Sequence, residues 1–186
     1  QRSDEWGGSL ENRMRFPLAV VDAVTNIVKK HQRPDFIVGY RFSPEEAGDN
    51  GITMAETFAL IDALVTKPLQ YLHVSLWDFY KLARRGADET RTRIEQLHAR
   101  IGGKLPLIGV GNIYTGEQAE QAFATGWAEF IALGKTLLLN PNWAELAANG
   151  GEFATEIDPD RAEEYRLPAR LLHLNLQGDQ AWLPPV

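Results

Sequence analysis

Apolar residues along this chain follow two different patterns. From Arg13 to Gln32 they recur every three or four positions, which is the spacing of one face of an amphipathic helix. Further along, short continuous apolar runs end at glycine or proline, which is typical of strands buried on both faces of a parallel sheet. The chain is therefore predicted to be an α/β protein whose strands and helices alternate.

The apolar runs and their flanking turn residues set the order of the elements. Two predicted helices begin with a capping box, in which a threonine and the glutamate or glutamine three residues later satisfy each other's backbone N–H groups. Strands are predicted at Phe36–Phe42, Tyr71–Leu76, Leu105–Ile113 and Phe130–Lys135. The helices between them are predicted at Thr53–Val65, Ile94–Ile101 and Thr115–Gly126.

The two ends of the chain carry weaker patterns. Residues 1–12 are polar and contain glycine, so they are predicted to be a loop, and residues 13–151 are assigned to the βα units. Asn140 and Pro141 are predicted to begin a last helix that ends before Gly151. Residues 152–186 are assigned to a C-terminal tail, where Asp158 and Pro159 can start a short helix and residues 182–185 resemble a docking segment.

Four successive strand–helix units fit either an open doubly wound sheet or part of a closed (β/α)8 barrel. A dinucleotide-binding sheet places its glycine-rich turn after an early strand, whereas the glycines here follow the third and fourth predicted strands. In TIM barrels the phosphate site commonly follows strands seven and eight. We therefore expect the chain to be approximately strands 5–8 of a barrel, that is, a half-barrel.

Composition narrows the function. The chain has 186 residues, 44% of them hydrophobic and 24% charged, which is ordinary for one globular domain. A net charge of −6, without a basic cluster interleaved with aromatic residues, argues against nucleic-acid binding. The chain lacks cysteine, its four histidines lack metal-ligand spacing, and no apolar run approaches the roughly 18 residues of a membrane span. Neither a metal nor a membrane is expected, and a cytoplasmic location fits best.

Glycines at the ends of the last two predicted strands indicate where chemistry takes place. Gly109, Gly111 and Gly134 would let backbone N–H groups approach an anion, and Lys135 would add positive charge. Asn112 lies in the same turn and either contributes a donor or caps the turn. The interpretation is a phosphate-binding site, and the alternative is a set of tight turns without a ligand.

Several stretches of the chain together resemble one enzyme family. Asp4–Pro17 reads DEWGGSLENRMRFP, with tryptophan where the family usually has tyrosine. Further similar stretches are Val38–Pro44, Gly109–Ile113, Ala132–Lys135 and Asn140–Trp143. With these stretches the chain resembles the C-terminal half of the old yellow enzyme family of FMN-dependent NADH:flavin oxidoreductases.

The resemblance implies a cofactor and a reaction. FMN would take a hydride from NADH or NADPH and pass it to a small-molecule acceptor, typically an α,β-unsaturated carbonyl compound. Arg41 would lie beside the flavin ring, and Gly109, Gly111, Asn112, Gly134 and Lys135 would hold its phosphate. Lys135 stands where the family usually has arginine, which removes the bidentate fork from this contact.

The resemblance also implies that part of the active site lies elsewhere. Strands 1–4 of the family's barrel carry the active-site tyrosine and the pair that anchors the substrate, so no catalytic residue is assigned to this chain. The isolated chain is therefore expected to be inactive. We expect it to form a homo-oligomer or to associate with the N-terminal half of the barrel.

Simpler interpretations remain open at this stage. Arg41 could pair with Glu45 or Glu46, and His73 is better explained as a hydrogen-bonded residue of the core. Lys81, Arg84 and Arg85 could meet the phosphates of a nicotinamide dinucleotide, although a solvated loop is the commoner explanation. For the whole chain, the alternatives are another phosphate-binding barrel enzyme, such as an aldolase or isomerase, and a non-catalytic half-barrel that self-associates.

Overall fold

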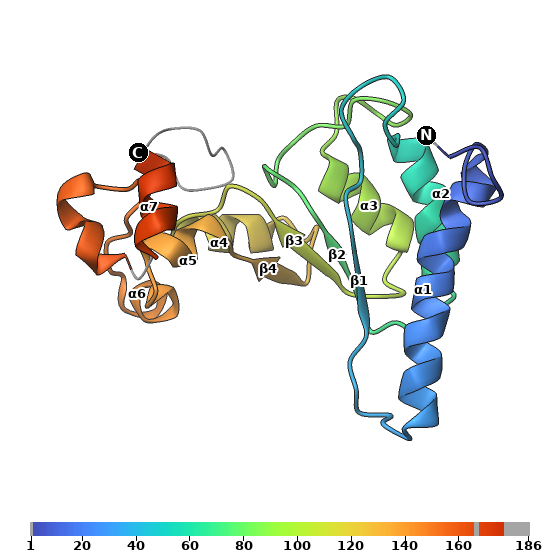
Figure 1. Ribbon diagram of the computed structural model, residues 1–186. Helices are drawn as coiled ribbons and strands as arrows, with labels where there is room; N and C mark the ends of the chain where they lie inside the picture. Colours follow the sequence, from blue (N-terminus) through green and yellow to red (C-terminus); the bar gives the residue numbers. More distant parts are fainter. Residues whose placement is uncertain (1, 166–167, 177–186) are drawn as a thin grey trace.

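The computed structural model describes residues 2–165 and 168–176, and the centre of this region is a parallel sheet. Its strands pair in the order β1-β2-β3-β4, and all three pairings are parallel (Figure 1). The strands are β1 (Gly39–Phe42), β2 (Tyr71–Val74), β3 (Leu107–Val110) and β4 (Phe130–Ala132). The prediction of four βα units with one parallel sheet is confirmed.

Helices follow and precede these strands as the alternating pattern predicted. Both predicted capping boxes are formed, at Thr53 with Glu56 and at Thr115 with Gln118. The helices are α1 (Leu10–Lys30), α2 (Met54–Leu64), α3 (Arg93–Ile101), α4 (Gly116–Ala124), α5 (Lys135–Leu139), α6 (Trp143–Asn149), the 3₁₀ helix η1 (Pro159–Glu164) and α7 (Ala169–Leu176). In Figure 1, α1, α2 and α3 lie on one side of the molecule, and α5, α6 and α7 extend beyond β4.

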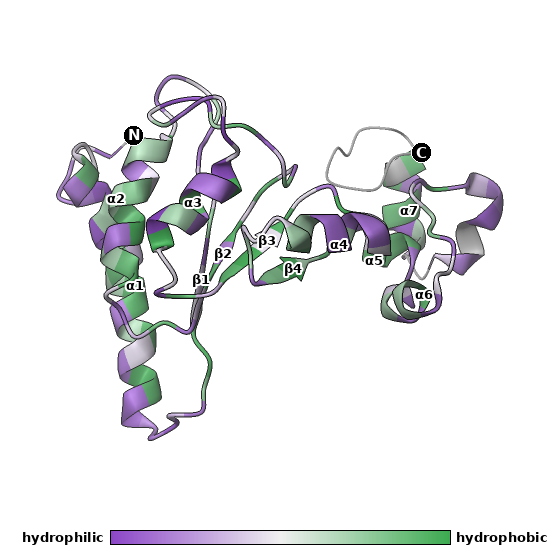
Figure 2. Cartoon of the chain, turned by 180° about the vertical axis from the view of Figure 1, so that it is seen from behind, coloured by the Kyte–Doolittle hydropathy of each residue, from purple (hydrophilic) through white to green (hydrophobic). Residues whose placement is uncertain are grey.

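The main core fills the space between the sheet and the helices that cover one of its faces. Leu72, Val74 and Leu107 point from β2 and β3 into this core and are almost completely buried, as are Ile61 of α2 and Leu97 of α3. Each such side chain contributes about 1.5–3 kcal/mol by leaving water. Figure 2 shows hydrophobic residues over the strands and along α1. The helices are therefore attached to the sheet by burial of apolar surface.

Among the described residues, no helix covers the opposite face of the sheet. Because side chains alternate along a strand, the residues next to the core positions point to this second face. One register row across all four strands joins Arg41 to His73, His73 to Ile108, and Ile108 to Phe130. Phe130 is 57% exposed. In a complete barrel this row would face the interior.

Every strand is shorter than predicted and the first helix begins earlier, and hydrogen bonds explain two of these differences. The first helix begins at Leu10, inside the predicted loop 1–12, because the Ser9 hydroxyl accepts a hydrogen bond from the Asn12 N–H at 3.2 Å. The strand predicted from Phe36 begins only at Gly39. The Phe36 N–H donates to Arg33 within a turn, so this end of the apolar run cannot pair with β2.

The prediction that Asn140 starts a helix is wrong. The residues before it form α5, and the Asn140 side chain instead binds the backbone of Ala154, accepting from its N–H at 2.9 Å and donating to its carbonyl at 2.9 Å. Helix α6 starts three residues later, after Asn142. Asn140 therefore fastens the segment that follows α6 to the end of α5.

The described residues after Gly151 form defined structure rather than an irregular tail. Leu139, Ile157 and Tyr165 form a second, small apolar cluster, and the Asp158 side chain accepts a hydrogen bond from the Asp160 N–H at the start of η1. The predicted short helix at Asp158 and Pro159 is thus confirmed, whereas α7 was not predicted. The predicted docking segment at residues 182–185 lies outside the described residues. None of the helices within the described ranges is long and apolar enough to cross a membrane.

Asn140→Ala should destabilise the chain by about 1–3 kcal/mol, because two partly buried backbone groups of Ala154 would lose their partner. Asn142→Ala is the matched control, since the Asn142 side chain makes no capping hydrogen bond and is exposed; it should change the free energy of unfolding by less than about 0.5 kcal/mol. Urea denaturation measures both variants. Equal effects of the two substitutions would contradict this assignment.

Candidate functional site

Parallel pairing brings the carboxyl ends of all four strands to one edge of the sheet. Arg41 lies in β1 near its end, Ser75 directly follows β2, Gly111 directly follows β3, and Gly134 lies just after β4. The prediction that these residues share one edge is confirmed. Open α/β sheets and barrels bind their ligands at this edge, so it is the candidate site.

Arg41 has a defined partner at this edge. Its Nη2 atom donates a hydrogen bond to the Ser75 hydroxyl at 2.9 Å, which links β1 to the end of β2. The alternative pairing with Glu45 is not formed, because the carboxylate of Glu45 is surrounded by other arginines. The Arg41 guanidinium is exposed, so its positive charge remains available to a ligand at the edge.

His73 lies next to Arg41 in the register row of the uncovered face. Burial, and then the positive charge of Arg41, lower the pKa of His73 below its ordinary value, so the imidazole is neutral at neutral pH. Its Nε2 atom is buried and has no hydrogen-bond partner within the described part of the chain. The expectation of a fully hydrogen-bonded core histidine is therefore wrong for this atom.

The two candidate glycines of β3 have packing reasons for being glycine. A Cβ atom on Gly109 would lie 2.6 Å from the Phe79 ring and 2.7 Å from Ile94. Gly111 has a φ of 133°, and a Cβ there would lie 2.8 Å from the backbone of Asp78. The Phe79 N–H donates to the Gly111 carbonyl at 3.0 Å. The loop after β2 therefore rests on the end of β3.

The end of β4 is different because it is open. Apart from the two neighbouring residues in the chain, no described residue has an atom within 4 Å of the position that a Cβ would take on Gly134. Lys135 follows, and its Nζ atom lies 5.5 Å from the centre of the exposed Trp77 ring. Asn112 is exposed and has a left-handed φ of 54°. Open space beside a cation fits a phosphate, so the residues at this end of the edge fit the phosphate of FMN better than Gly109 does.

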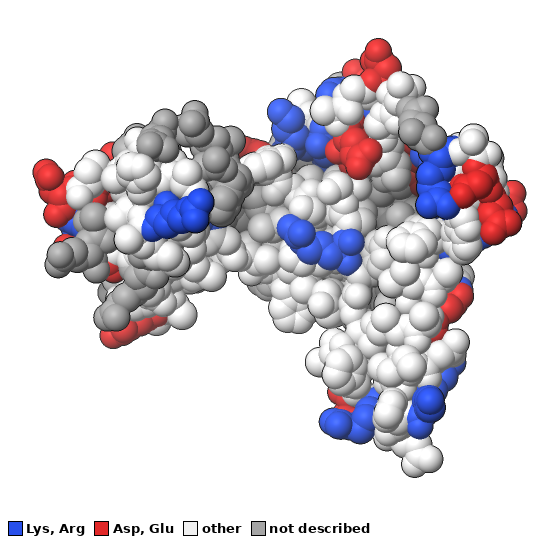
Figure 3. Space-filling view, viewed as in Figure 1, with Lys and Arg blue, Asp and Glu red and all other residues white. Residues whose placement is uncertain are grey.

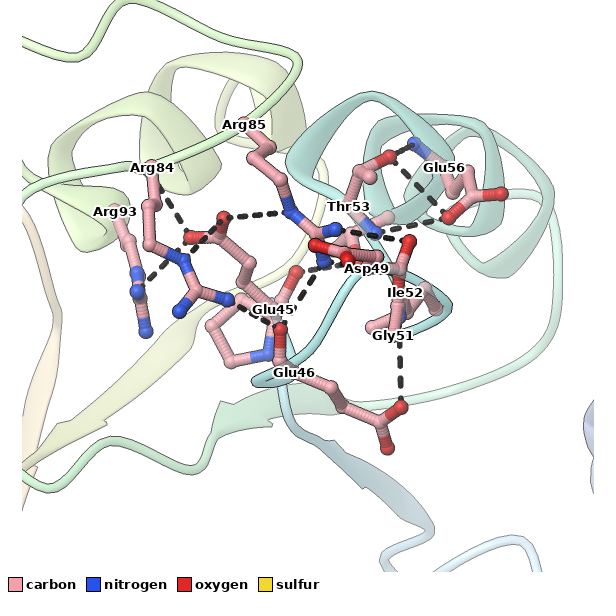
Figure 4. Close-up of polar contacts among 12 residues, drawn as sticks. Glu45, Glu46, Asp49, Gly51, Ile52, Thr53, Glu56, Arg84, Arg85 and Arg93 are labelled. Atoms are coloured by element: carbon pink, nitrogen blue, oxygen red, sulfur yellow. Dashed lines mark hydrogen bonds and ion pairs between the residues drawn. The ribbon is translucent and has the colours of Figure 1, made fainter.

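A buried carboxylate organises the loops at the other end of the edge. The Glu45 side chain is 0% exposed, and the Arg93 Nη2 atom lies 2.9 Å from its Oε2 atom (Figure 4). The backbone N–H of Arg84 also donates to Oε2, at 3.2 Å. The Nε atoms of Arg84 and Arg85 lie 3.6 Å and 3.9 Å from Oε1. This Glu45 cluster joins the loop after β1 to the loop after β2.

The Glu45 cluster also shows what Arg85 of the predicted basic loop contacts. Arg85 is only 28% exposed and donates hydrogen bonds to the carbonyls of Glu46, Asp49 and Gly51. The interpretation of this loop as a solvated face is therefore wrong for Arg85. Glu45 and Arg93 were missed as important residues, because nothing in the acidic run 45–51 marks one glutamate as buried. Within the described ranges, no group of three or more His, Asp or Glu side chains could hold a metal ion.

Comparison with known proteins gives a consistent set of relatives. The profile of the NADH:flavin oxidoreductase / NADH oxidase family matches residues 1–152. The Bacillus subtilis protein named "Probable NADH-dependent flavin oxidoreductase YqiG" is 45% identical over 186 residues, which cover 99% of this chain and 50% of that protein. The NADH:acrylate oxidoreductase of Vibrio harveyi is 35% identical over 174 residues, covering 92% of this chain and 17% of that protein.

A solved structure of morphinone reductase is similar as well. It superposes with a TM-score of 0.61 at 30% identity, over 86% of this chain and 40% of that chain. The chain thus spans about half the length of the Bacillus subtilis relative and a smaller share of the other two proteins. The match to part of a larger barrel agrees with the four-stranded sheet described above.

Gly109→Ala and Gly134→Ala should have different effects on folding. The added methyl group at Gly109 meets Phe79 and Ile94, which should cost about 1–3 kcal/mol of stability. Gly134 has open space and a φ of −130°, so its substitution should change stability by less than about 0.5 kcal/mol. Thermal unfolding of both variants measures this difference, and a destabilised Gly134→Ala variant would show that this glycine is needed for packing.

Proposed function

Because the chain belongs to the NADH:flavin oxidoreductase / NADH oxidase family, and its fold is part of the TIM barrel of old yellow enzymes, we propose that it supplies the flavin-phosphate half of an FMN-dependent oxidoreductase. The observation that carries this proposal is the shared edge with two cations, Arg41 at β1 and Lys135 beyond β4. One cation serves the ring of the flavin, and the other serves its phosphate.

When bound, FMN supplies hydride transfer from a nicotinamide cofactor to an acceptor, here proposed to be the alkene of an α,β-unsaturated carbonyl compound. The residues of this chain bind and orient the cofactor. Arg41, held by Ser75, places positive charge where the reduced ring carries negative charge. Lys135 meets the phosphate as a single point charge, and the open backbone at Gly134 lets the phosphate approach.

No catalytic acid or base is assigned to this chain. Glu45 is buried at the candidate edge, but its carboxylate is committed to Arg84, Arg85 and Arg93, so it cannot act as one member of an acid–base pair. Family membership also removes the alternative of an aldolase or isomerase. The groups that protonate the acceptor and anchor the substrate are proposed to lie in the other half of the barrel.

The chain offers large surfaces for that other half. Phe16, Val20, Val24 and Ile27 are exposed along α1, and Ile37 before β1 is 68% exposed. Strands β1 and β4 are the two outermost strands of the sheet, so their outer backbone groups have no strand partner among the described residues. Burial of apolar surface at about 25 cal/mol per Å² favours a partner that covers it. We propose that this partner is the N-terminal half of a barrel, with a second copy of the chain as the alternative.

Mixing the chain with the N-terminal half of the Bacillus subtilis relative should therefore produce a flavin-containing complex. The expected results are a 1:1 complex by sedimentation, bound-flavin absorbance, and NADH-dependent reduction of an enone, with NADPH as the comparison. The chain alone should associate with itself and show no turnover. A colourless mixture, or full turnover by the isolated chain, would contradict the proposed division of the site.

In the complete enzyme, Lys135→Ala should weaken FMN affinity about tenfold or more, because a charge-assisted hydrogen bond contributes about 1.5–3 kcal/mol. Lys135→Arg should preserve or improve the affinity, because arginine adds a bidentate phosphate contact. Lys104→Ala, at the opposite edge of the sheet, is the matched control. Flavin dissociation constants measure all three variants, and an unchanged value for Lys135→Ala would remove Lys135 from the site.

A further inference from the structure

A hollow of about 710 Å³ opens between the loop after β1 and the loop after β2. Arg41 and Ser75 belong to its wall, so it adjoins the proposed flavin site. The side chains that matter most for its chemistry are those of Trp77, Lys81, Arg84 and Arg93. An aromatic ring and several cations in one hollow are suited to a ligand that has both a planar ring and negative charge.

The charges of this hollow favour an anion. Its wall contains four basic and three acidic side chains, although the chain as a whole has a net charge of −6. All three carboxylates are already engaged: Glu45 with arginines, Glu46 with the Ile52 N–H at 3.4 Å, and Asp78 with the Tyr80 N–H at 2.8 Å. Figure 3 shows basic atoms gathered over the loops that follow β1 and β2, next to acidic ones. A local excess of positive charge in an acidic protein attracts oxyanions to this place.

The arginines of the wall are held in place before any ligand arrives. Arg93 donates from Nε to the Leu82 carbonyl at 3.1 Å and pairs through Nη2 with Glu45. Arg84 donates from Nη2 to the Glu46 carbonyl at 2.6 Å. A guanidinium has five N–H groups, and these contacts use only some of them. Preorganised donors lose little entropy when they bind, which makes them good contacts for a diphosphate.

Trp77 supplies the apolar part of the hollow. It is 71% exposed, and its ring faces the Lys135 ammonium group. An exposed indole is a platform on which a nucleotide base can stack, with a contribution of about 1–3 kcal/mol. Trp77 follows β2 and lines the hollow, so such a platform lies between the cations of the hollow and Lys135.

The order of the strands indicates which end of a bound dinucleotide would lie over the hollow. The proposed flavin phosphate lies beyond β4, and the hollow lies at the opposite end of the edge, between the loops of β1 and β2. A reductant that meets the flavin ring beside Arg41 therefore has its distal half over this hollow. Resting on the proposed function, we propose that the hollow binds the adenosine diphosphate half of the nicotinamide dinucleotide, with Lys81, Arg84 and Arg93 on the diphosphate and Trp77 on the adenine.

The carboxylate of an unsaturated acid acceptor is an oxyanion like the diphosphate of the dinucleotide. The experiment therefore compares ADP with such acids. Calorimetric titration of the purified 186-residue chain with ADP should show binding that weakens as salt is added. Adenosine should bind at least about tenfold more weakly, as expected for the loss of charge-assisted contacts. Acrylate and fumarate should not compete with ADP. Competition by either acid at the same concentration would assign the hollow to the acceptor and overturn the proposal.

Variants test which residues hold ADP. Lys81→Glu should lower ADP affinity about tenfold or more, and Lys81→Arg should retain it, because Lys81 is exposed in the loop. Lys104→Glu is the charge-matched control at the other edge of the sheet and should leave ADP affinity unchanged. Trp77→Ala should weaken ADP but not inorganic pyrophosphate. Circular dichroism confirms that each variant is folded.

The outcomes separate this proposal from the proposed flavin site. Lys135→Ala should lower ADP affinity by no more than about fivefold, the effect of losing an exposed cation–π contact with Trp77; a larger loss would place the diphosphate at the phosphate end of the edge and overturn the proposal. A folded chain that does not bind ADP, or equal effects of Lys81→Glu and Lys104→Glu, would also overturn it. Because ADP binding is measured without flavin, failure of the reconstituted complex to bind FMN leaves this result standing as a separate nucleotide site.

Discussion

Three parallel strand pairings place every strand's carboxyl end at the same edge, and the remaining features of the molecule follow from this arrangement. The loops after β1 and β2 meet in the Glu45 cluster, and the loop after β2 rests on the end of β3 at Gly111. The turn after β4 stays open at Gly134. One edge therefore has a rigid end, where arginines are fixed by a buried carboxylate, and an open end that a phosphate can approach.

Burying a carboxylate between two loops costs desolvation free energy unless nearby cations and hydrogen bonds compensate its charge. Three arginines and a backbone N–H surround Glu45, although its Oε1 atom accepts no hydrogen bond within the described residues, and two of these arginines, Arg84 and Arg93, line the hollow. The same contacts that stabilise the loops thus also hold the arginines of the proposed anion-binding hollow. Structure and binding depend here on one group of side chains.

The sequence predicted those features that depend on local chemistry. Capping boxes at Thr53 and Thr115, and apolar runs that end at glycine, require only neighbouring residues, and they predicted the order of helices and strands. Features that depend on distant residues were not predictable. Asn140 binds a backbone 14 residues away, Glu45 meets arginines 39 to 48 positions later, and Gly109 is glycine because Phe79 packs against it. The candidate site residues lie at one edge of the sheet as predicted, whereas only family resemblance pointed to the flavin itself.

The uncovered sheet has a consequence for how copies of the chain can add to one another. Strands β1 and β4 are the two outermost strands of the sheet, so copies that add by continuing the parallel sheet pair β4 of one copy with β1 of the next, which is a head-to-tail contact. Two copies form a closed ring if the curvature of the sheet brings the last edge back to the first, and otherwise the same contact continues as an open helical fibre. Sheet curvature, rather than the strength of the edge contact, therefore decides between a finite particle and a polymer.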